Sequence, residues 1–250
     1  MSTVHFVGAG PGAPDLLTLR GRDLLEQAAV VIYAGSLVNP ALLDYTKKGS
    51  EIHNSAEMTL DEVIAVMTTA SEQGKKIVRL HTGDPSLYGA IREQMDRLKA
   101  LGISYDICPG VSSFCAAAAA LEAEYTLPGV SQTLIITRAE GRTAVPEGEK
   151  LSALASHGAT MVLFLSAGML DKVSAELIKG GLSPETPAAI VYKASWPEQQ
   201  ILRGTVGTLA KLGAAEKTAL VIVGNVLGDE YELSRLYAPD FTTAFREGRP

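Results

Sequence analysis

Short apolar runs separated by amphipathic stretches fill the first half of the chain. Between the runs, apolar residues recur at intervals of three and four, for example in the segment that starts at Thr59, and this spacing predicts helices. The alternation of strands with helices favours a parallel sheet. The five expected strands are residues 4–7, 30–33, 51–55, 76–80 and 105–107.

The second half of the chain alternates less regularly. Residues 124–131, with Pro128 and Gly129, are expected to link two domains, residues 1–123 and 132–250. The last two strand assignments indicate some antiparallel pairing, and an irregular tail is expected beyond Tyr237. The predicted fold class is α/β, a parallel five-stranded sheet followed by a mixed sheet. The second domain is expected to have strands at 133–137, 160–165, 188–192, 200–204 and 219–223 and helices at 151–155, 169–179 and 206–212.

Composition limits the classes of partner. The chain has 250 residues, of which 46% are hydrophobic and 20% charged, so it is long enough to bury a core and has the balance of a soluble protein. A formal net charge of −6 argues against a nucleic-acid partner and against an anionic membrane surface. A small anionic substrate stays compatible with this charge if arginines gather at its site.

The cysteines and histidines indicate no metal site. We interpret Cys108 and Cys115 as reduced thiols that fill apolar space, and the four histidines lack metal-ligand spacing. The N-terminus lacks a basic segment followed by an apolar one, and the apolar runs are too short to span a bilayer. We therefore expect a cytoplasmic protein with no bound metal and no membrane partner.

Three loops at the carboxyl ends of predicted strands carry the candidate chemistry. They are residues 8–14, 82–89 and 109–113, and loops at this end of an open α/β sheet collect the ligand. In the second loop, Asp84 fits the N-cap of a long helix and Pro85 fits its first position. The alternative for each loop is a tight connection that binds nothing.

The first loop also matches a dinucleotide fingerprint at Gly8, Gly10 and Ala13. Its prolines keep a helix from starting directly after the glycines, and the second strand ends in Ala34 instead of the acid that a ribose requires. A nucleoside-bearing ligand without phosphates suits this loop better than a dinucleotide. A dinucleotide-dependent oxidoreductase remains the alternative from another class.

The ordered set of loops resembles the tetrapyrrole (uroporphyrin, corrin) methyltransferases, and the resemblance covers nearly the whole chain. Its features are a glycine-proline loop followed by Leu-Leu-Thr-Leu-Arg at 16–20, then Gly-Asp-Pro at 83–85 and Pro-Gly-Val-Ser at 109–112. The resemblance implies a homodimer with S-adenosylmethionine folded into a cleft between two α/β domains. At Leu165, one implied contact, many relatives have methionine. The implied cofactor contacts are Pro11, Thr82, Gly83, Asp84, Leu87, Ser112, Ser113, Leu165, Ala194, Thr218 and Ala219.

Four further stretches are similar to the branch of this family that acts on precorrin-4 or cobalt-precorrin-4 in cobalamin synthesis. They are residues 33–38, 53–60, 137–143 and 192–197. The resemblance implies methylation of ring carbon 11 of precorrin-4, which gives precorrin-5. The uroporphyrinogen branch usually has Asp where this chain has Ala34. A cobalt-bearing substrate, another corrin-ring methyltransferase and a diphthamide methyltransferase stay open.

Methyl transfer to a ring carbon is an in-line displacement at a sulfonium, so alignment and exclusion of water are the main requirements. Asp84 is a candidate for orienting the cofactor, and Tyr88 for contacting the substrate. A corrin precursor carries many carboxylates, which arginine forks hold well, so Arg138 and Arg142 are the candidate clamp for this anionic tetrapyrrole. Trp196 is a candidate apolar wall for the ring. For each of these side chains, ordinary packing, capping or surface ion pairing is the alternative.

Overall fold

The computed structural model describes residues 2–213 and 218–249. The chain forms two compact units, Met1–Ala117 with Lys193–Gln200, and Ala118–Tyr192 with Ile201–Pro250. The change from one unit to the other therefore falls inside the helix α4 (Ser113–Leu121), upstream of residue 124. The domain boundaries expected from the sequence stay a prediction, because compactness alone does not test which part folds independently.

The first unit contains a five-stranded sheet in the order β3-β2-β4-β1-β5. All four of its pairings are parallel, which confirms the predicted parallel sheet. Because β1 lies between β4 and β5, the loops that follow these three strands leave the sheet side by side. The strands are β1 (Val4–Gly8), β2 (Val30–Tyr33), β3 (Glu51–Asn54), β4 (Ile77–His81) and β5 (Tyr105–Cys108).

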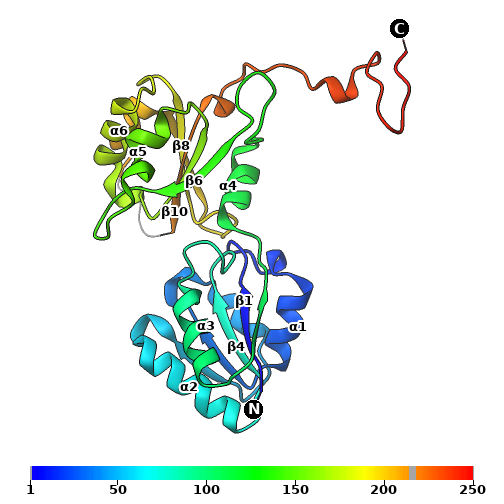
Figure 1. The fold of residues 1–250 in the computed structure, drawn as a ribbon, viewed down its shortest axis with the longest axis vertical. Coiled ribbons are helices and arrows are strands. Elements are labelled where there is room, and N and C mark those ends of the chain that lie inside the picture. The colour runs from blue at the N-terminus through cyan, green and yellow to red at the C-terminus, as the bar shows by residue number, and fades with distance from the viewer. Residues whose placement is uncertain (1, 214–217, 250) are drawn as a thin grey trace. The chain divides into compact units, whose positions relative to one another are not determined.

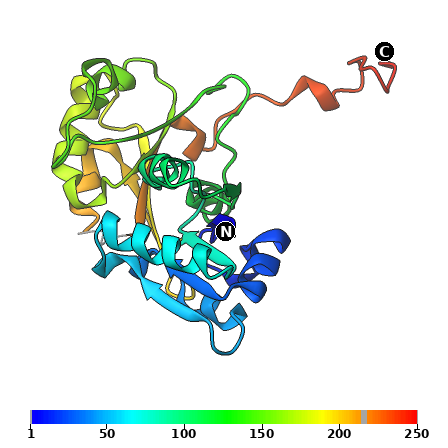
Figure 2. The ribbon, with the colours of Figure 1, turned by 60° about the horizontal axis from the view of Figure 1, so that its bottom comes forward.

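Helices cover both faces of this sheet (Figure 1). On one face, α2 (Leu60–Glu72) and α3 (Ile91–Ala100) bury side chains such as Met67 and Leu98 against Phe6, and Figure 2 shows both helices along that face. On the other face, α1 (Leu19–Gln27) packs Leu25 against β1, β2 and β4. A capping box between Thr59 and Glu62 fixes the start of α2, as the sequence predicts.

The sequence predicts a helix that starts directly after Asp84 and Pro85, and this predicted start is wrong. Residues 85–88 form a turn, and α3 begins only at Ile91. Tyr88 and Ala90 have left-handed backbone angles, φ 56° and φ 48°, so a right-handed helix cannot run through them. Asp84 therefore caps a turn and does not cap α3.

The second unit contains a mixed sheet in the order β6-β7-β10-β8-β9. The β6–β7 pair is parallel, whereas β10 runs antiparallel to β7 and β8, which confirms the predicted mixed sheet. Its core joins the sheet to α5 (Leu151–Ala155) and α6 (Leu170–Lys179). The strands are β6 (Leu134–Arg138), β7 (Thr160–Phe164), β8 (Pro187–Tyr192), β9 (Gln200–Thr205) and β10 (Ala219–Val223).

Two segments of the second unit differ in detail from expectation. The helix expected at 206–212 is a 3-10 helix, Val206–Lys211, in which Gly207 packs against Pro184. The expected linker is tied to the second unit, because the Thr160 hydroxyl donates to the carbonyl of Tyr125 at 2.9 Å. Beyond Tyr237, residues 238–249 contain neither helix nor strand, as expected for the tail.

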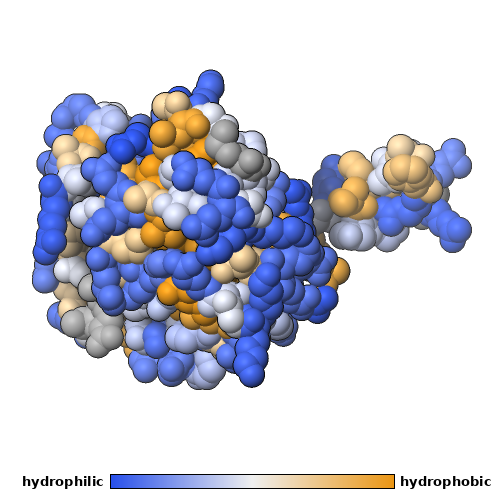
Figure 3. Space-filling model, turned by 90° about the horizontal axis from the view of Figure 1, so that it is seen from below, coloured by the Kyte–Doolittle hydropathy of each residue, from blue (hydrophilic) through white to orange (hydrophobic). Residues whose placement is uncertain are grey.

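The surface in Figure 3 carries mainly hydrophilic side chains with smaller apolar patches between them. Within residues 2–213 and 218–249, no helix combines the length and the apolar character needed to cross a membrane.

Candidate functional site

The three predicted loops of the first unit meet through their backbones. Gly10 and Gly83 form a two-way bridge, with N–H···O distances of 3.2 and 2.8 Å. A Cβ on Gly8 would lie 2.6 Å from the Cα of Gly110, and a Cβ on Gly110 would lie 2.2 Å from the carbonyl oxygen of Gly83. Only glycine fits such approaches, so the sequence itself allows the three loops to converge.

Asp84 fastens the second loop to the third. Its Oδ2 accepts a hydrogen bond from the backbone N–H of Gly110 at 2.8 Å, and its Oδ1 accepts from the N–H of Ser86 at 2.9 Å and from the Ser86 hydroxyl. Burial raises the pKa of the Asp84 carboxyl, but the hydrogen bonds from Ser86 and Gly110 outweigh burial and hold it below its usual value. Asp84 is therefore an ionised connector of two loops.

Two buried ionisable groups lie on β4 just before the second loop. The guanidinium of Arg79 donates to Gln94 Oε1 at 3.1 Å and to the carbonyl of Ile32 at 3.2 Å, and burial lowers its pKa to about 10. Burial and, to a smaller extent, the charge of Arg79 lower the pKa of His81 to about 3. The imidazole of His81 is therefore neutral at physiological pH, and its buried Nε2 has no hydrogen-bond partner among residues 2–213 and 218–249.

The predicted cofactor positions of the first unit lie on or beside these loops. Pro11, Gly83 and Ser112 are buried, and the other predicted cofactor positions of the three loops are partly exposed. Ala194 is also buried and belongs to this unit. Tyr88, the predicted substrate contact, is 45% exposed. The partly exposed positions are Thr82, Asp84, Leu87 and Ser113.

The glycine-proline loop is held by a segment that is remote in the sequence. Trp196 donates its indole N–H to the carbonyl of Pro11 at 2.9 Å, and Ser195 Oγ accepts the backbone N–H of Ala13 at 3.0 Å. Asn39 Nδ2 donates to the carbonyl of Gly12 at 2.9 Å. The structure thus brings the predicted residues Pro11, Ala194 and Trp196 into one neighbourhood.

In the second unit, the remaining predicted cofactor positions share one edge of the mixed sheet. Leu165 directly follows β7, and Thr218 directly precedes β10. The antiparallel register, with Leu163 opposite Val221, places the start of β10 beside the end of β7. Leu165 is 67% exposed although it is a leucine, whereas Ala219 is buried opposite Tyr192.

Backbone strain marks the same positions independently. Non-glycine residues seldom adopt a positive φ, and those that do gather at binding and catalytic sites. Seven such residues occur in the described chain, and five of them coincide with or adjoin a predicted site position. The exceptions are Ala90 and Glu122. The five are Tyr88, Leu165, Lys193, Ser195 and Thr218.

The two predicted clamp arginines have different surroundings. The guanidinium of Arg138 folds back on its own loop and donates to the carbonyls of Ala139, Thr143 and Ala144 at 3.3, 3.1 and 2.7 Å. Arg142 is exposed, and it forms no hydrogen bond or ion pair within the described ranges. Arg138 therefore shapes the loop that presents Arg142.

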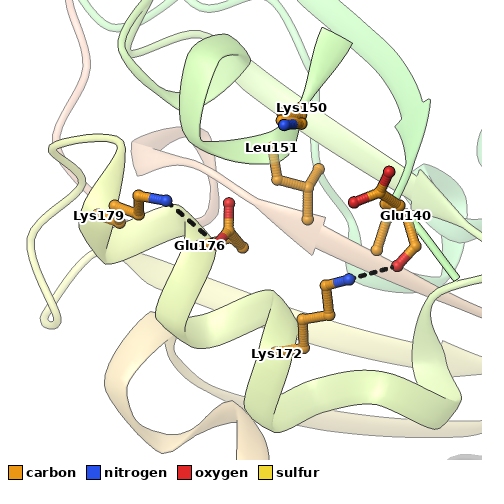
Figure 4. A pocket seen from close by; sticks show the side chains of 7 residues that line it. Glu140, Lys150, Leu151, Lys172, Glu176 and Lys179 are labelled. Carbon is orange, nitrogen blue, oxygen red and sulfur yellow. Dashed lines mark hydrogen bonds and ion pairs between the residues drawn. The ribbon is translucent and has the colours of Figure 1, made fainter. Parts of the chain in front are cut away.

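A pocket of about 160 Å³ lies next to this loop in the second unit (Figure 4). The ammonium groups of its three lysines already interact with oxygen atoms of the protein. Lys172 Nζ donates to the carbonyl of Glu140 at 2.8 Å, Lys179 lies 3.7 Å from the carboxylate of Glu176, and Lys150 forms an ion pair with a neighbouring glutamate. The pocket is therefore a satisfied ion-pair cluster. Its lining residues are Ala139, Glu140, Lys150, Leu151, Lys172, Glu176 and Lys179.

Sequence reasoning missed three residues that lie on or beside the loops. Asn39 precedes a proline, a common turn signal, but nothing in the sequence pairs it with Gly12. Ser195 lies in the 192–197 stretch that carries the family resemblance, but nothing in that stretch predicts its contact with Ala13. His81 has the pattern of an ordinary strand residue. Within the described ranges, no group of three or more His, Cys, Asp or Glu side chains is arranged to hold a metal ion.

The model of the family "Tetrapyrrole (Corrin/Porphyrin) Methylases" matches residues 3–210. The chain is 56% identical to the cobalt-precorrin-4 C(11)-methyltransferase of Methanocaldococcus jannaschii, over 98% of this chain and 96% of the relative. It is 45% identical to the precorrin-4 C(11)-methyltransferase of Pseudomonas aeruginosa, over 98% of this chain and 99% of the relative.

A solved structure of a cobalt precorrin-4 methyltransferase has the same fold. It matches with a TM-score of 0.88 and 48% sequence identity, and the match covers 91% of this chain and 96% of the other.

Proposed function

This chain belongs to the tetrapyrrole (corrin/porphyrin) methylases, and on that premise we propose that it transfers a methyl group from S-adenosylmethionine to ring carbon 11 of precorrin-4. The product of this reaction is precorrin-5, an intermediate of cobalamin biosynthesis. Relatives that act on the cobalt-free and on the cobalt-bearing substrate are both similar to the chain over nearly its full length. Cobalt-precorrin-4 is therefore the second candidate substrate.

The observation that carries the proposal is the strain at the predicted cofactor positions. A left-handed non-glycine residue costs on the order of 1–3 kcal/mol and persists only where its surroundings demand it. Lys193 and Ser195 flank Ala194, Tyr88 follows Leu87, and Leu165 and Thr218 are themselves predicted contacts. The coincidence of positive φ values with positions that the family resemblance implies supports the proposal.

The residues of the first unit fit a nucleoside-bearing methyl donor. Gly8, Gly83 and Gly110 let three backbones approach closely, which leaves peptide edges and small side chains to line the site. The strand β2 runs into Ala34, so the acid that a dinucleotide's ribose requires is missing there. Pro11, Thr82, Ser112 and Ala194 would hold the donor.

In the proposed reaction the donor supplies an electrophilic methyl group on a sulfonium. The protein's part is alignment of the ring carbon with that methyl group and exclusion of water. Asp84 contributes by fixing the second loop to the third. The neutral His81 adds no positive charge beneath a site that binds a cation.

On the substrate side we propose that Arg142 contacts a carboxylate of the tetrapyrrole, while Arg138 shapes the loop from which Arg142 projects. An exposed guanidinium can form a bidentate contact with a carboxylate. We further propose that the enzyme works in the cytoplasm as a homodimer, and that Tyr88 contacts the substrate.

The decisive experiment incubates the purified protein with labelled S-adenosylmethionine and either precorrin-4 or cobalt-precorrin-4. Mass analysis and NMR of the product should show one new methyl group on carbon 11. Calorimetry should show binding of S-adenosylhomocysteine and no binding of NAD. Methylation at another carbon, or NAD binding alone, would refute the proposal.

A further inference from the structure

The segment Lys193–Gln200 connects β8 to β9 of the second unit, yet it packs within the first unit. Its anchor is Trp196, the single tryptophan of the chain, whose indole N–H donates to the carbonyl of Pro11 at 2.9 Å. The preceding residue, Ser195, accepts the N–H of Ala13 at 3.0 Å. A segment that follows β8 in the sequence thus holds the glycine-proline loop within the first unit.

This grip acts on two successive peptide groups. Trp196 holds the carbonyl of the Pro11–Gly12 peptide, and Ser195 holds the N–H of the Gly12–Ala13 peptide. Asn39, which follows β2 in the sequence, donates to the carbonyl of that second peptide group. Hydrogen bonds from side chains, and not backbone pairing between strands, therefore set the orientation of these two peptide groups in the glycine-proline loop.

The indole also fills the space beside Gly12. A Cβ on Gly12 would lie 1.9 Å from Cδ1 and 2.0 Å from Nε1 of Trp196, so a larger residue at Gly12 would displace the indole. The ring is held from its face by the ammonium group of Lys193, 4.8 Å from the ring centroid. Lys193 in turn lies 3.7 Å from Glu198 of the same segment.

The segment carries a predicted cofactor contact between two strained residues. Ala194 is buried, and its neighbours Lys193 and Ser195 have φ of 45° and 69°. The hydrogen bond of Ser195 to Ala13 and the ion pair of Lys193 hold these conformations in place. The same short segment thus fixes Ala194 and the peptide after Pro11.

We propose that Lys193–Gln200 is a clamp that presets the glycine-proline loop for the methyl donor, with Trp196 and Ser195 as positioning residues. The proposal rests on the proposed function and deepens it. Pro11 and Ala194 form one preformed wall of the donor site because the clamp joins them before the donor arrives. Trp196 then serves donor binding, in place of the ring contact expected from the sequence.

The first test compares Trp196→Phe with wild type by calorimetry with S-adenosylhomocysteine. Phenylalanine keeps an aromatic ring but cannot donate to Pro11, so we expect about 3- to 10-fold weaker binding. The KM for the tetrapyrrole at saturating donor should not change, because the clamp acts on the donor loop. Tyr105→Phe, which removes one hydroxyl group from an aromatic ring at the end of β5 opposite the loops, is the matched control and should bind as wild type does.

The second test is a double-mutant cycle between Gly12 and Trp196. Gly12→Ala should weaken binding strongly in wild type, and by a several-fold smaller factor in a Trp196→Ala background where the indole no longer occupies the space. Urea unfolding of the same four proteins measures the coupling without any ligand. Because Trp196 is the single tryptophan of the chain, its fluorescence should change when S-adenosylhomocysteine binds.

The outcomes separate the two proposals. Wild-type affinity in Trp196→Phe, together with equal losses for Gly12→Ala in both backgrounds, would overturn the clamp and leave the proposed function standing. Coupling in urea unfolding without any binding of S-adenosylhomocysteine would refute the methyl donor and with it the clamp's role in donor binding. Weaker binding in Trp196→Phe with an unchanged tetrapyrrole KM, and coupling in the cycle, would support the clamp.

Discussion

At the scale of single residues, Asp84 shows how one charged side chain can hold two loops together. Its two carboxylate oxygens accept hydrogen bonds from the N–H groups of Ser86 and Gly110. Removal of the carboxylate therefore breaks the connection between the second loop and the third. Hydrogen bonds to charged groups contribute about 1.5–3 kcal/mol each. We expect Asp84→Ala to lower the free energy of unfolding by about 2 kcal/mol and to weaken S-adenosylhomocysteine binding as well.

Asp84→Asn is the control for this prediction, because the amide oxygen still accepts one of the backbone N–H groups. Urea titration measures stability and calorimetry measures affinity for each variant. A destabilised Asp84→Ala protein with wild-type affinity would mean that the connection between the two loops does not matter for donor binding.

The buried His81 predicts a specific pH dependence of stability. Its pKa is lowered from 6.5 to about 3 in the folded protein, so between these values the unfolded chain binds a proton that the folded chain rejects. Stability therefore rises with pH in this window and is lost as pH falls, with a slope of up to about 1.4 kcal/mol per pH unit. We expect His81→Leu to lack this component, whereas the exposed His157→Gln should keep it.

Denaturant titrations at several pH values between 4 and 7 measure these slopes. Carboxylates titrate in the same range, so the informative quantity is the difference between each variant and wild type. Equal slopes for His81→Leu and wild type would contradict the low pKa of His81.

The neighbouring arginines of the 138–143 loop should separate by function. Arg142→Ala should raise the KM for the tetrapyrrole several-fold and leave donor affinity unchanged, because a charge-assisted contact is lost. Arg142→Lys should recover only part of the loss, since an ammonium cannot replace a planar fork. Arg138→Ala should mainly lower stability, because three carbonyls lose their donor. Unchanged steady-state kinetics in Arg142→Ala would exclude it as a carboxylate contact.

Some of these residues were predictable and others were not. Gly8, Gly83 and Gly110 stand in short sequence patterns, and the close approach that glycine permits is a local property. Asn39 and Ser195 reach peptides 27 and 182 positions away, so no local pattern announces their partners. The sequence also placed a carboxylate clamp at Arg138 without any sign that its guanidinium folds back on its own loop.

At the scale of elements, apolar runs located the strands well, but the start of α3 was missed. A strand buried on both faces is a continuous apolar run, whereas the left-handed residues Tyr88 and Ala90 are ordinary residue types with no sequence signal. Pro85 marked a turn and was interpreted as the first residue of a helix. The strain that delays α3 comes from the tertiary setting of the second loop.

This strain can be tested at Ala90. Glycine adopts a φ of 48° without steric cost, so Ala90→Gly should raise the free energy of unfolding by about 0.5–1 kcal/mol. Ala100→Gly, the same substitution within α3, should lower it by up to about 1 kcal/mol. Thermal and urea unfolding measure both changes, and a loss of stability in Ala90→Gly would show that its backbone is not strained.

At the scale of the whole molecule, two α/β units with a parallel and a mixed sheet follow from the order of strands in the sequence. The membership of Lys193–Gln200 in the first unit does not. Chain order places this segment between two strands of the second unit, whereas its contacts with residues such as Pro11 and Ala13 hold it in the first unit. Contacts made across long sequence separations are what a single sequence conceals.

The last prediction concerns assembly. Leu233, Tyr237 and Phe245 in the C-terminal segment are exposed at 81%, 80% and 100%, and large exposed apolar groups often mark an interaction surface. Two-fold oligomers are the commonest assemblies of soluble enzymes. We therefore expect light scattering at micromolar concentration to give twice the chain mass of 26.3 kDa. Truncation after Gly228 should lower the measured mass toward that of a single truncated chain, because the C-terminal segment is then missing from the interface. A full-length protein that stays monomeric across the micromolar range would remove the dimer from the proposal.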